Sequence, residues 1–156
     1  MNIHLDSPFS GVERFALHVA SPVEYRLLDK RWEDADGDFS KLLKEKGLPI
    51  LNEASVWDNW DPHNSARIFI EGACVWDQQG RGLGGALTVN LRMTRQAFVY
   101  VGSDLRAVIV DLYRESLLEV IDYDEEFERF TSLANRLIQK FIVDYALFLN
   151  PPEDEV

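Results

Sequence analysis

The stretch ARIFIEGACVW, residues 66–76, combines β-branched and aromatic side chains, which favour β-strands. Downstream, ALTVNLRM at residues 86–93 alternates apolar with polar side chains, and FVYV at residues 98–101 is a third strand-like run. Residues 78–85 lie between the first two runs, contain four glycines and predict a hairpin connection. Because the links between the three runs are short, we expect an antiparallel sheet at the centre of the fold.

Helical patterns precede this sheet. Ser10–Glu13 and Ser21–Glu24 each match a capping box, in which serine and glutamate satisfy backbone donors at the start of a helix. They predict two short consecutive helices over residues 11–33. We expect an aspartate-rich turn at residues 34–38, and then one or two further helical turns over residues 39–46.

Helical patterns also follow the sheet. Asp104 is placed to cap a helix that runs to about residue 120, although residues 107–110 could instead begin a strand. From Phe127 to Phe148, apolar residues recur every three or four positions, which is the spacing of one buried helical stripe. We expect Asp124 to cap this second helix.

The sequence therefore predicts an α+β fold with an N-terminal helical pair, a central antiparallel sheet of three to four strands, and two C-terminal helices packed on one face. The chain has 156 residues, of which 46% are apolar, and this is enough for one hydrophobic core. We expect a single globular domain over residues 1–150 and an acidic C-terminal tail over residues 151–156.

The net charge of −11 limits the classes of partner. Nucleic acids and anionic membrane surfaces both require basic patches, so neither is expected to bind. A basic protein would instead be steered toward the chain. The single cysteine, Cys74, rules out an intramolecular disulfide, and the N-terminus does not resemble a signal peptide. We expect a cytoplasmic protein whose cysteine is buried and inert.

Residues Gly80–Gly85 match the G-x-G-x-x-G pattern of dinucleotide-binding loops. That loop needs a strand before it and a helix after it, whereas strands are predicted here on both sides. The segment is better interpreted as a flexible hairpin, and no cofactor is expected.

Two groups of acids have partial metal-binding patterns. Asp34, Asp36, Asp38 and Glu45 have the spacing of calcium-loop positions 1, 3, 5 and 12, but Phe39 stands where the loop requires glycine. A turn that caps the next helix explains the same residues.

Asp58, Asp61 and His63 form the second group, without a recognisable zinc motif elsewhere in the sequence. They are also ordinary loop residues, so we predict neither a metal site nor catalytic residues.

The segment around residues 57–61 is one candidate for binding a partner. Trp57 and Trp60 alternate with Asp58 and Asp61, and tryptophan is favoured at the centres of protein interfaces. Exposed tryptophans flanked by acids would suit a basic partner. The alternative is that both rings fold inward and pin the loop to the core.

The second candidate is a run of acids. Between residues 111 and 128 there are eight acids against one base, Arg114. On the predicted helix, Glu115, Glu119 and Asp122 would share one face and repel each other, a cost that a binding surface for cations could explain. The alternative, which the sequence favours, is a plain solvated face.

The leading functional hypothesis is a small acidic protein that neutralises or chaperones a basic protein partner. A bacterial immunity protein or antitoxin directed against a cationic toxin would be a concrete case. One alternative is a carboxylate- or metal-dependent hydrolase, because paired acids leave no sequence signature. Another is a structural subunit or homodimer, in which symmetry buries an exposed apolar patch.

Overall fold

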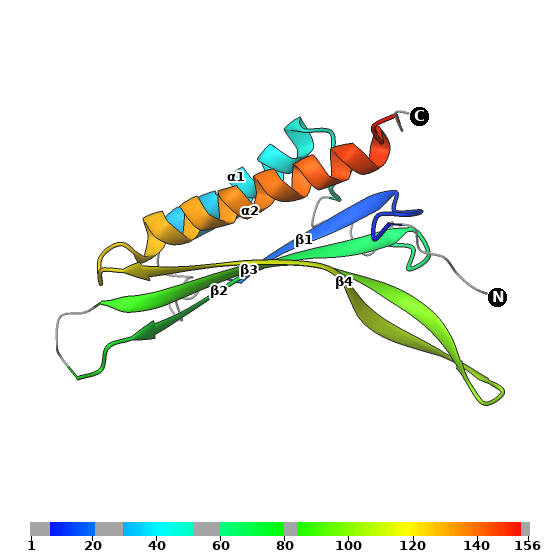
Figure 1. The fold of residues 1–156 in the computed structure, drawn as a ribbon, viewed down its shortest axis with the longest axis horizontal. Coiled ribbons are helices and arrows are strands. Elements are labelled where there is room, and N and C mark those ends of the chain that lie inside the picture. Colours follow the sequence, from blue (N-terminus) through cyan, green and yellow to red (C-terminus); the bar gives the residue numbers. More distant parts are fainter. Residues whose placement is uncertain (1–6, 21–29, 52–59, 80–83, 154–156) are drawn as a thin grey trace.

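The computed structural model describes residues 7–20, 30–51, 60–79 and 84–153. Within these residues, one mixed sheet lies beneath a layer of helices (Figure 1). In chain order the elements are β1 (Arg14–Ala20), α1 (Lys30–Glu45), β2 (Ser65–Trp76), β3 (Gly85–Val101), β4 (Asp104–Ile121) and α2 (Glu126–Leu149). Both helices cover the same face of the sheet, and we call the other face the open face.

The strands of the described sheet lie in the order β1-β2-β3-β4. β1 pairs with β2 in parallel, from Arg14 beside Ser65 to Ala20 beside Glu71. The other two pairings are antiparallel. A parallel pair needs a long crossover between its strands, and α1 lies within that connection. The chain therefore makes a β-α-β unit first and a three-stranded meander second.

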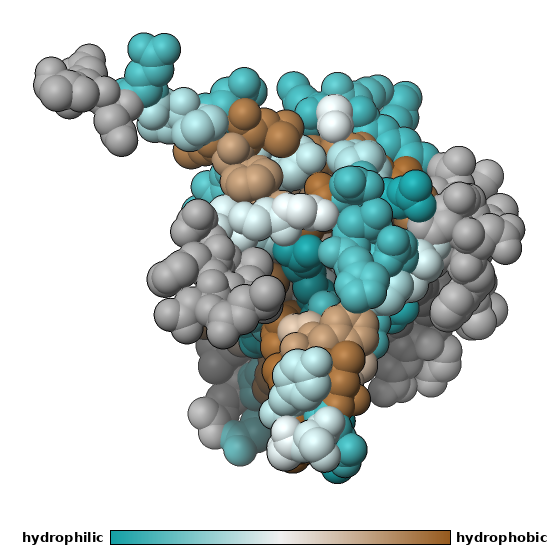
Figure 2. All heavy atoms as spheres, turned by 90° about the vertical axis from the view of Figure 1, so that its right-hand side faces the viewer, coloured by the Kyte–Doolittle hydropathy of each residue, from teal (hydrophilic) through white to brown (hydrophobic). Residues whose placement is uncertain are grey.

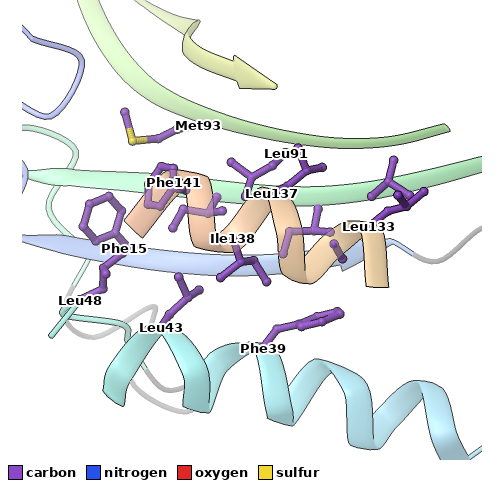
Figure 3. Close-up of a cluster of buried hydrophobic side chains, with 14 of the residues drawn as sticks. Phe15, Phe39, Leu43, Leu48, Leu91, Met93, Leu133, Leu137, Ile138 and Phe141 are labelled. Atoms are coloured by element: carbon purple, nitrogen blue, oxygen red, sulfur yellow. The ribbon is translucent and has the colours of Figure 1, made fainter. Parts of the chain in front are cut away.

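The core lies between the sheet and the two helices (Figure 3). Alternate residues of β3 point toward the helices and are fully buried, namely Leu87, Val89, Leu91 and Met93. The stripe predicted on α2 meets them and is buried at Phe130, Leu133, Ala134, Leu137, Ile138, Phe141 and Tyr145. Phe39 and Leu43 of α1 are buried in the same core and complete its helical side.

The predicted N-terminal helical pair is wrong. Residues 14–20 form β1, and Gly11 adopts a positive φ of 71° in the turn that precedes it. Phe15 and Val19 are four positions apart, a spacing that places residues on one side of a strand as well as of a helix. The second capping box, Ser21–Glu24, lies outside the described residues.

The aspartate-rich turn predicted at residues 34–38 is also wrong, because α1 runs through it. The predicted helical turns at residues 39–46 are the second half of the same helix. Gly47, with a φ of 88°, follows its end, as is common after helices.

The helix predicted from Asp104 to about residue 120 is the second large error. These residues form β4, which pairs with β3 along its whole length. Asp104 pairs with Val101 at one end, and Ile121 pairs with Gly85 at the other. The alternative strand reading of residues 107–110 is the correct one. In consequence the described chain has one C-terminal helix where two were predicted, and its sheet is mixed, with β1 parallel.

The central prediction fares better. Residues 66–76 and 86–93 form antiparallel strands, as their patterns predicted. Residues 98–101 are not a third strand but the continuation of β3. The long helix also occurs as predicted, although it begins at Glu126 with Glu125 at its N-cap, where Asp124 was expected.

The ends of β3 and β4 extend past the rest of the sheet. The pairing of β2 with β3 stops at Ala66–Arg95, so residues 96–101 of β3 pair only with residues 104–109 of β4 among the described strands. A register shift at Met93/Thr94 adds one residue to β4, and such bulges bend a strand. The resulting two-stranded arm bends away from the helices (Figure 1). We call residues 96–101 and 104–109 the arm.

Candidate functional site

Two of the predicted partner-binding acids lie on a strand rather than on a helix. Glu115 and Glu119 are two alternations apart on β4, so both point toward α2. Lys140 Nζ lies 2.6 Å from Glu115 Oε1, and Arg129 Nη1 lies 3.0 Å from Glu119 Oε1. These carboxylates tie the sheet to α2, so they are already used inside the fold.

Asp122 follows β4 and belongs to a different cluster. Asp122 lies near the start of α2 with Asp124, Glu125 and Glu128, and we call these four acids the acidic end. Arg129 Nε donates to Glu125 Oε2 at 2.9 Å, which lowers the pKa of Glu125. Hydrogen bonding to Glu125 and its charge raise the pKa of the exposed Asp122 carboxyl. Negative charge is therefore crowded here.

The helical layer has two open grooves, one at the acidic end and one between the helices. The first, about 530 Å³, is lined by Asp124, Glu125, Glu128, Arg129 and Ser132. The second, about 350 Å³, lies between the two helices and is lined by Asp34, Ala35, Asp38, Phe39, Phe127, Thr131 and Asn135. The α2 residues of the two grooves lie on the same helical turns, so the two grooves are neighbours, and the acids of the second groove are Asp34 and Asp38 of α1.

The predicted tryptophan segment is only partly described. Trp57 and Asp58 lie outside the described residues. Trp60 is half-buried beneath the Arg67 guanidinium, whose carbon lies 4.8 Å from the ring centroid. The Asp61 carboxylate accepts the backbone N–H of His63 at 3.0 Å. Trp60 is thus held against the sheet, and Asp61 shapes its own loop.

Ion pairs run across the middle of the open face. Arg92 lies 2.9 Å from Glu71 and 3.3 Å from Asp111, and Arg114 lies 2.8 Å from Asp111. The hydrogen bond from Arg114 is the main cause that lowers the pKa of Asp111. The guanidinium of Arg92 also stacks on Phe69 at 4.2 Å. Two arginines and two carboxylates are therefore paired in the middle of this face.

Both ends of the open face are apolar. At one end Val75, Leu118 and Val120 are 74%, 71% and 75% exposed. At the other end is the arm, whose apolar side chains stand out below a hydrophilic body in Figure 2. The exposed large apolar residues of the arm are Phe98, Val99, Tyr100, Val101, Leu105, Val108 and Ile109. Exposed apolar surface of this extent is typical of binding sites.

The structure does not support the cofactor and metal patterns weighed above. Gly80–Leu83 lie outside the described residues, and Gly85 begins a strand rather than a helix. Asp34 and Asp38 lie within α1, so the chain makes no calcium loop there. No group of three or more metal-ligating side chains is found among the described residues. Burial raises the pKa of the half-buried Cys74 thiol, which opposes nucleophilic reactivity.

Sequence reasoning missed the arm and the open face. Their signal was present, because residues 97–101 and 107–110 are apolar at every position, on both sides of the turn at Gly102. A strand covered on one face should alternate, so a run without alternation predicts a strand with two apolar faces. Reading residues 104–120 as a helix concealed this pattern.

No protein-family model matches the sequence, and no curated protein matches it. Among solved structures, the hypothetical protein CT253 from Chlamydia trachomatis is similar with a TM-score of 0.47 at 9% identity, over 90% of this chain and 99% of that one. A minor lipoprotein from Acinetobacter baumannii has a TM-score of 0.36 at 9% identity, over 85% and 94% of the two chains. Similarities this weak define neither a family nor a function.

Among the described residues, no helix has the length and apolar character needed to span a membrane.

Proposed function

We propose that this protein binds a basic protein partner through the acidic end and thereby neutralises or chaperones that partner. The observation that carries the proposal is the crowding of carboxylates at the start of α2. Asp124, Glu125 and Glu128 line one groove with Arg129, and Arg129 already pairs with Glu119 and Glu125. The pKa of Asp122 is raised first by its hydrogen bond with Glu125 and then by the charges of Glu125 and Asp124, and a cation from a partner would favour the charged form of this carboxyl.

The charge of the whole chain supports the same direction. A net charge of −11 attracts a basic protein over distance, and exposed carboxylates then act mainly on the association rate. Inhibition of a cationic toxin is the narrower form of this proposal, because a small acidic protein that covers a basic active surface blocks it. A cytoplasmic location would suit that role.

The test is capture from the native lysate at low salt, followed by measurements on the purified partner. We expect one dominant protein with a basic isoelectric point, released as salt rises. The double variant Asp122→Asn/Asp124→Asn should slow its association by about tenfold, because two steering charges are lost. Asparagine keeps the shape of each side chain, and neither residue is the N-cap of α2.

A matched control removes the same charge elsewhere. Glu45→Gln/Glu153→Gln also removes two carboxylates, from the end of α1 and from the C-terminal segment. Association that responds equally to both double variants would show that net charge alone acts and that the acidic end is not the site. Binding that is insensitive to salt would overturn the electrostatic proposal altogether.

A further inference from the structure

The open face has two apolar ends that the proposed basic partner does not explain. Val75, Ala86 and Val120 are aligned across β2, β3 and β4, and Leu118 lies beside them. We call these four residues the far patch. They alternate with residues that are buried against the helices, so they point to the opposite side.

The arm presents apolar side chains on the same side of the sheet. Arg92 of β3 faces the open side, where it pairs with Glu71 and Asp111, and counting alternate residues from Arg92 places Phe98 and Tyr100 on the same side. Their partners on β4, Ala107 and Leu105, share that side because paired residues do so. The bend of the arm away from the helices brings this apolar side over the space in front of the open face (Figure 1).

The charge of the open face suits a second copy of the chain. Between the far patch and the arm, β2, β3 and β4 place three arginines and two acids on the open face, a net charge of +1. These residues are Arg67, Arg92, Arg114, Glu71 and Asp111. The excess acids of a chain with net charge −11 therefore lie elsewhere. Two copies can bring these faces together without the repulsion that their acidic ends would cause.

We propose that two copies associate through their open faces, so that the arm of each covers the far patch of the other. A two-fold axis that lies between the sheets and across the strands reverses the strand direction. The arm of one copy then meets the far patch of its partner at both ends of the interface, which makes the contact self-complementary. In this arrangement the ion pairs in the middle of one open face lie opposite the same ion pairs of the second copy.

The available area is sufficient for such a dimer. β2 has 12 residues, and the arm adds several more residues of β3 and β4. With a rise of about 3.3 Å per residue and about 4.8 Å between strands, the open face and arm offer about 800 Å² per copy. A standard stable interface buries about 800 Å² per partner.

The first test is the mass of the purified chain by sedimentation equilibrium over a range of concentrations. We expect a reversible dimer. Tyr100→Ser in the arm and Val120→Ser in the far patch should each raise the dimer Kd by about tenfold or more, the loss of one central apolar contact. Val143→Ser, at an exposed apolar position of α2, is the control and should leave the Kd unchanged. All three side chains are exposed, so the variants should fold, and circular dichroism checks this.

The second test reports which surfaces meet. In a Cys74→Ala background, Tyr100→Cys and Val120→Cys proteins are mixed under mild oxidation. A disulfide-linked heterodimer should form much faster than either homodimer, because the arm of one copy lies on the far patch of the other. Tyr100→Cys mixed with Val143→Cys should cross-link only slowly.

Three results would overturn the proposal. One is a chain that stays monomeric up to about 100 µM, well above the Kd of a typical specific interface. Another is a dimer that neither Tyr100→Ser nor Val120→Ser weakens. The third is cross-linking of Tyr100→Cys with itself in preference to Val120→Cys, which would mean that arms pair with arms. None of these results affects the acidic end, so this inference and the proposed function can fail separately.

Discussion

Alanine in place of Gly84 should destabilise the fold far more than alanine in place of Gly102. Both glycines have a positive φ, 75° and 67°, which L-residues adopt only with strain. Their surroundings differ. A Cβ at Gly84 would lie 2.0 Å from the carbonyl oxygen of Ile121, at the end of β4, whereas a Cβ at Gly102 would have nothing within 4 Å. Gly102 therefore provides a matched control for backbone strain alone.

The expected magnitudes follow from these two terms. The left-handed conformation costs an alanine about 1–2 kcal/mol, which the lower entropy of the unfolded chain offsets by up to about 1 kcal/mol. Gly102→Ala should therefore lose about 1 kcal/mol. Gly84→Ala carries the same strain plus an overpacking cost of about 1–3 kcal/mol, because a backbone carbonyl must move. Its total loss should be roughly 3 kcal/mol.

Urea unfolding monitored by tryptophan fluorescence and circular dichroism measures both losses. Thermal unfolding gives a second measure. In a protein of this size, a loss of about 1 kcal/mol lowers Tm by about 2–4 °C, so the Tm of Gly84→Ala should be about 6–12 °C below that of the wild type. Equal midpoints for the two variants would refute the reasoning, because they would show that the β2–β3 connection does not approach the end of β4 as closely as described.

Three further outcomes are expected. Gly37→Ala, in the interior of α1 with no atom within 4 Å of the new Cβ, should raise the free energy of unfolding by about 0.5–1 kcal/mol in urea. Tyr113→Phe should lower it by about 1–2 kcal/mol, because the Tyr113 hydroxyl donates to Asp144 at 2.5 Å, whereas Tyr123→Phe, at an exposed hydroxyl, should cost less. Burial raises the pKa of Glu126, so its charged form costs stability above that pKa, and the cost disappears below the unfolded value. Glu126→Gln should therefore stabilise the fold at pH 7 and lose this advantage as the pH falls toward 4, measured by urea unfolding of both proteins at each pH; an advantage that persists at low pH would contradict the burial argument.

The parts of the fold that could be predicted are those whose patterns are long and local. The stripe from Phe127 to Phe148 repeats over several helical turns, so a strand could not produce it. The glycine-rich link at residues 78–85 lies between two runs of β-forming residues. A link this short between two strands favours a hairpin. In both places the neighbouring sequence contains the whole signal.

The two misread segments share an ambiguous spacing of four. Glu115 and Glu119 are close to one full turn apart on a helix and two full alternations apart on a strand, so they share a face in either structure. Phe15 and Val19 are ambiguous for the same reason. What decides each case is the partner strand, which for β1 is β2, about fifty residues away in the chain. Local sequence does not contain that information.

The same alternation explains why the two proposed surfaces differ in charge. On β4 the residues facing α2 include Glu115 and Glu119, and their charges are matched by Lys140 and Arg129. The residues facing away include Arg114, which is paired on the open face. The excess of acids is consequently left beyond β4, in the turn and first residues of α2, where there is no opposite strand to neutralise them. A basic partner at the acidic end and a second copy on the open face would then occupy opposite sides of one strand layer.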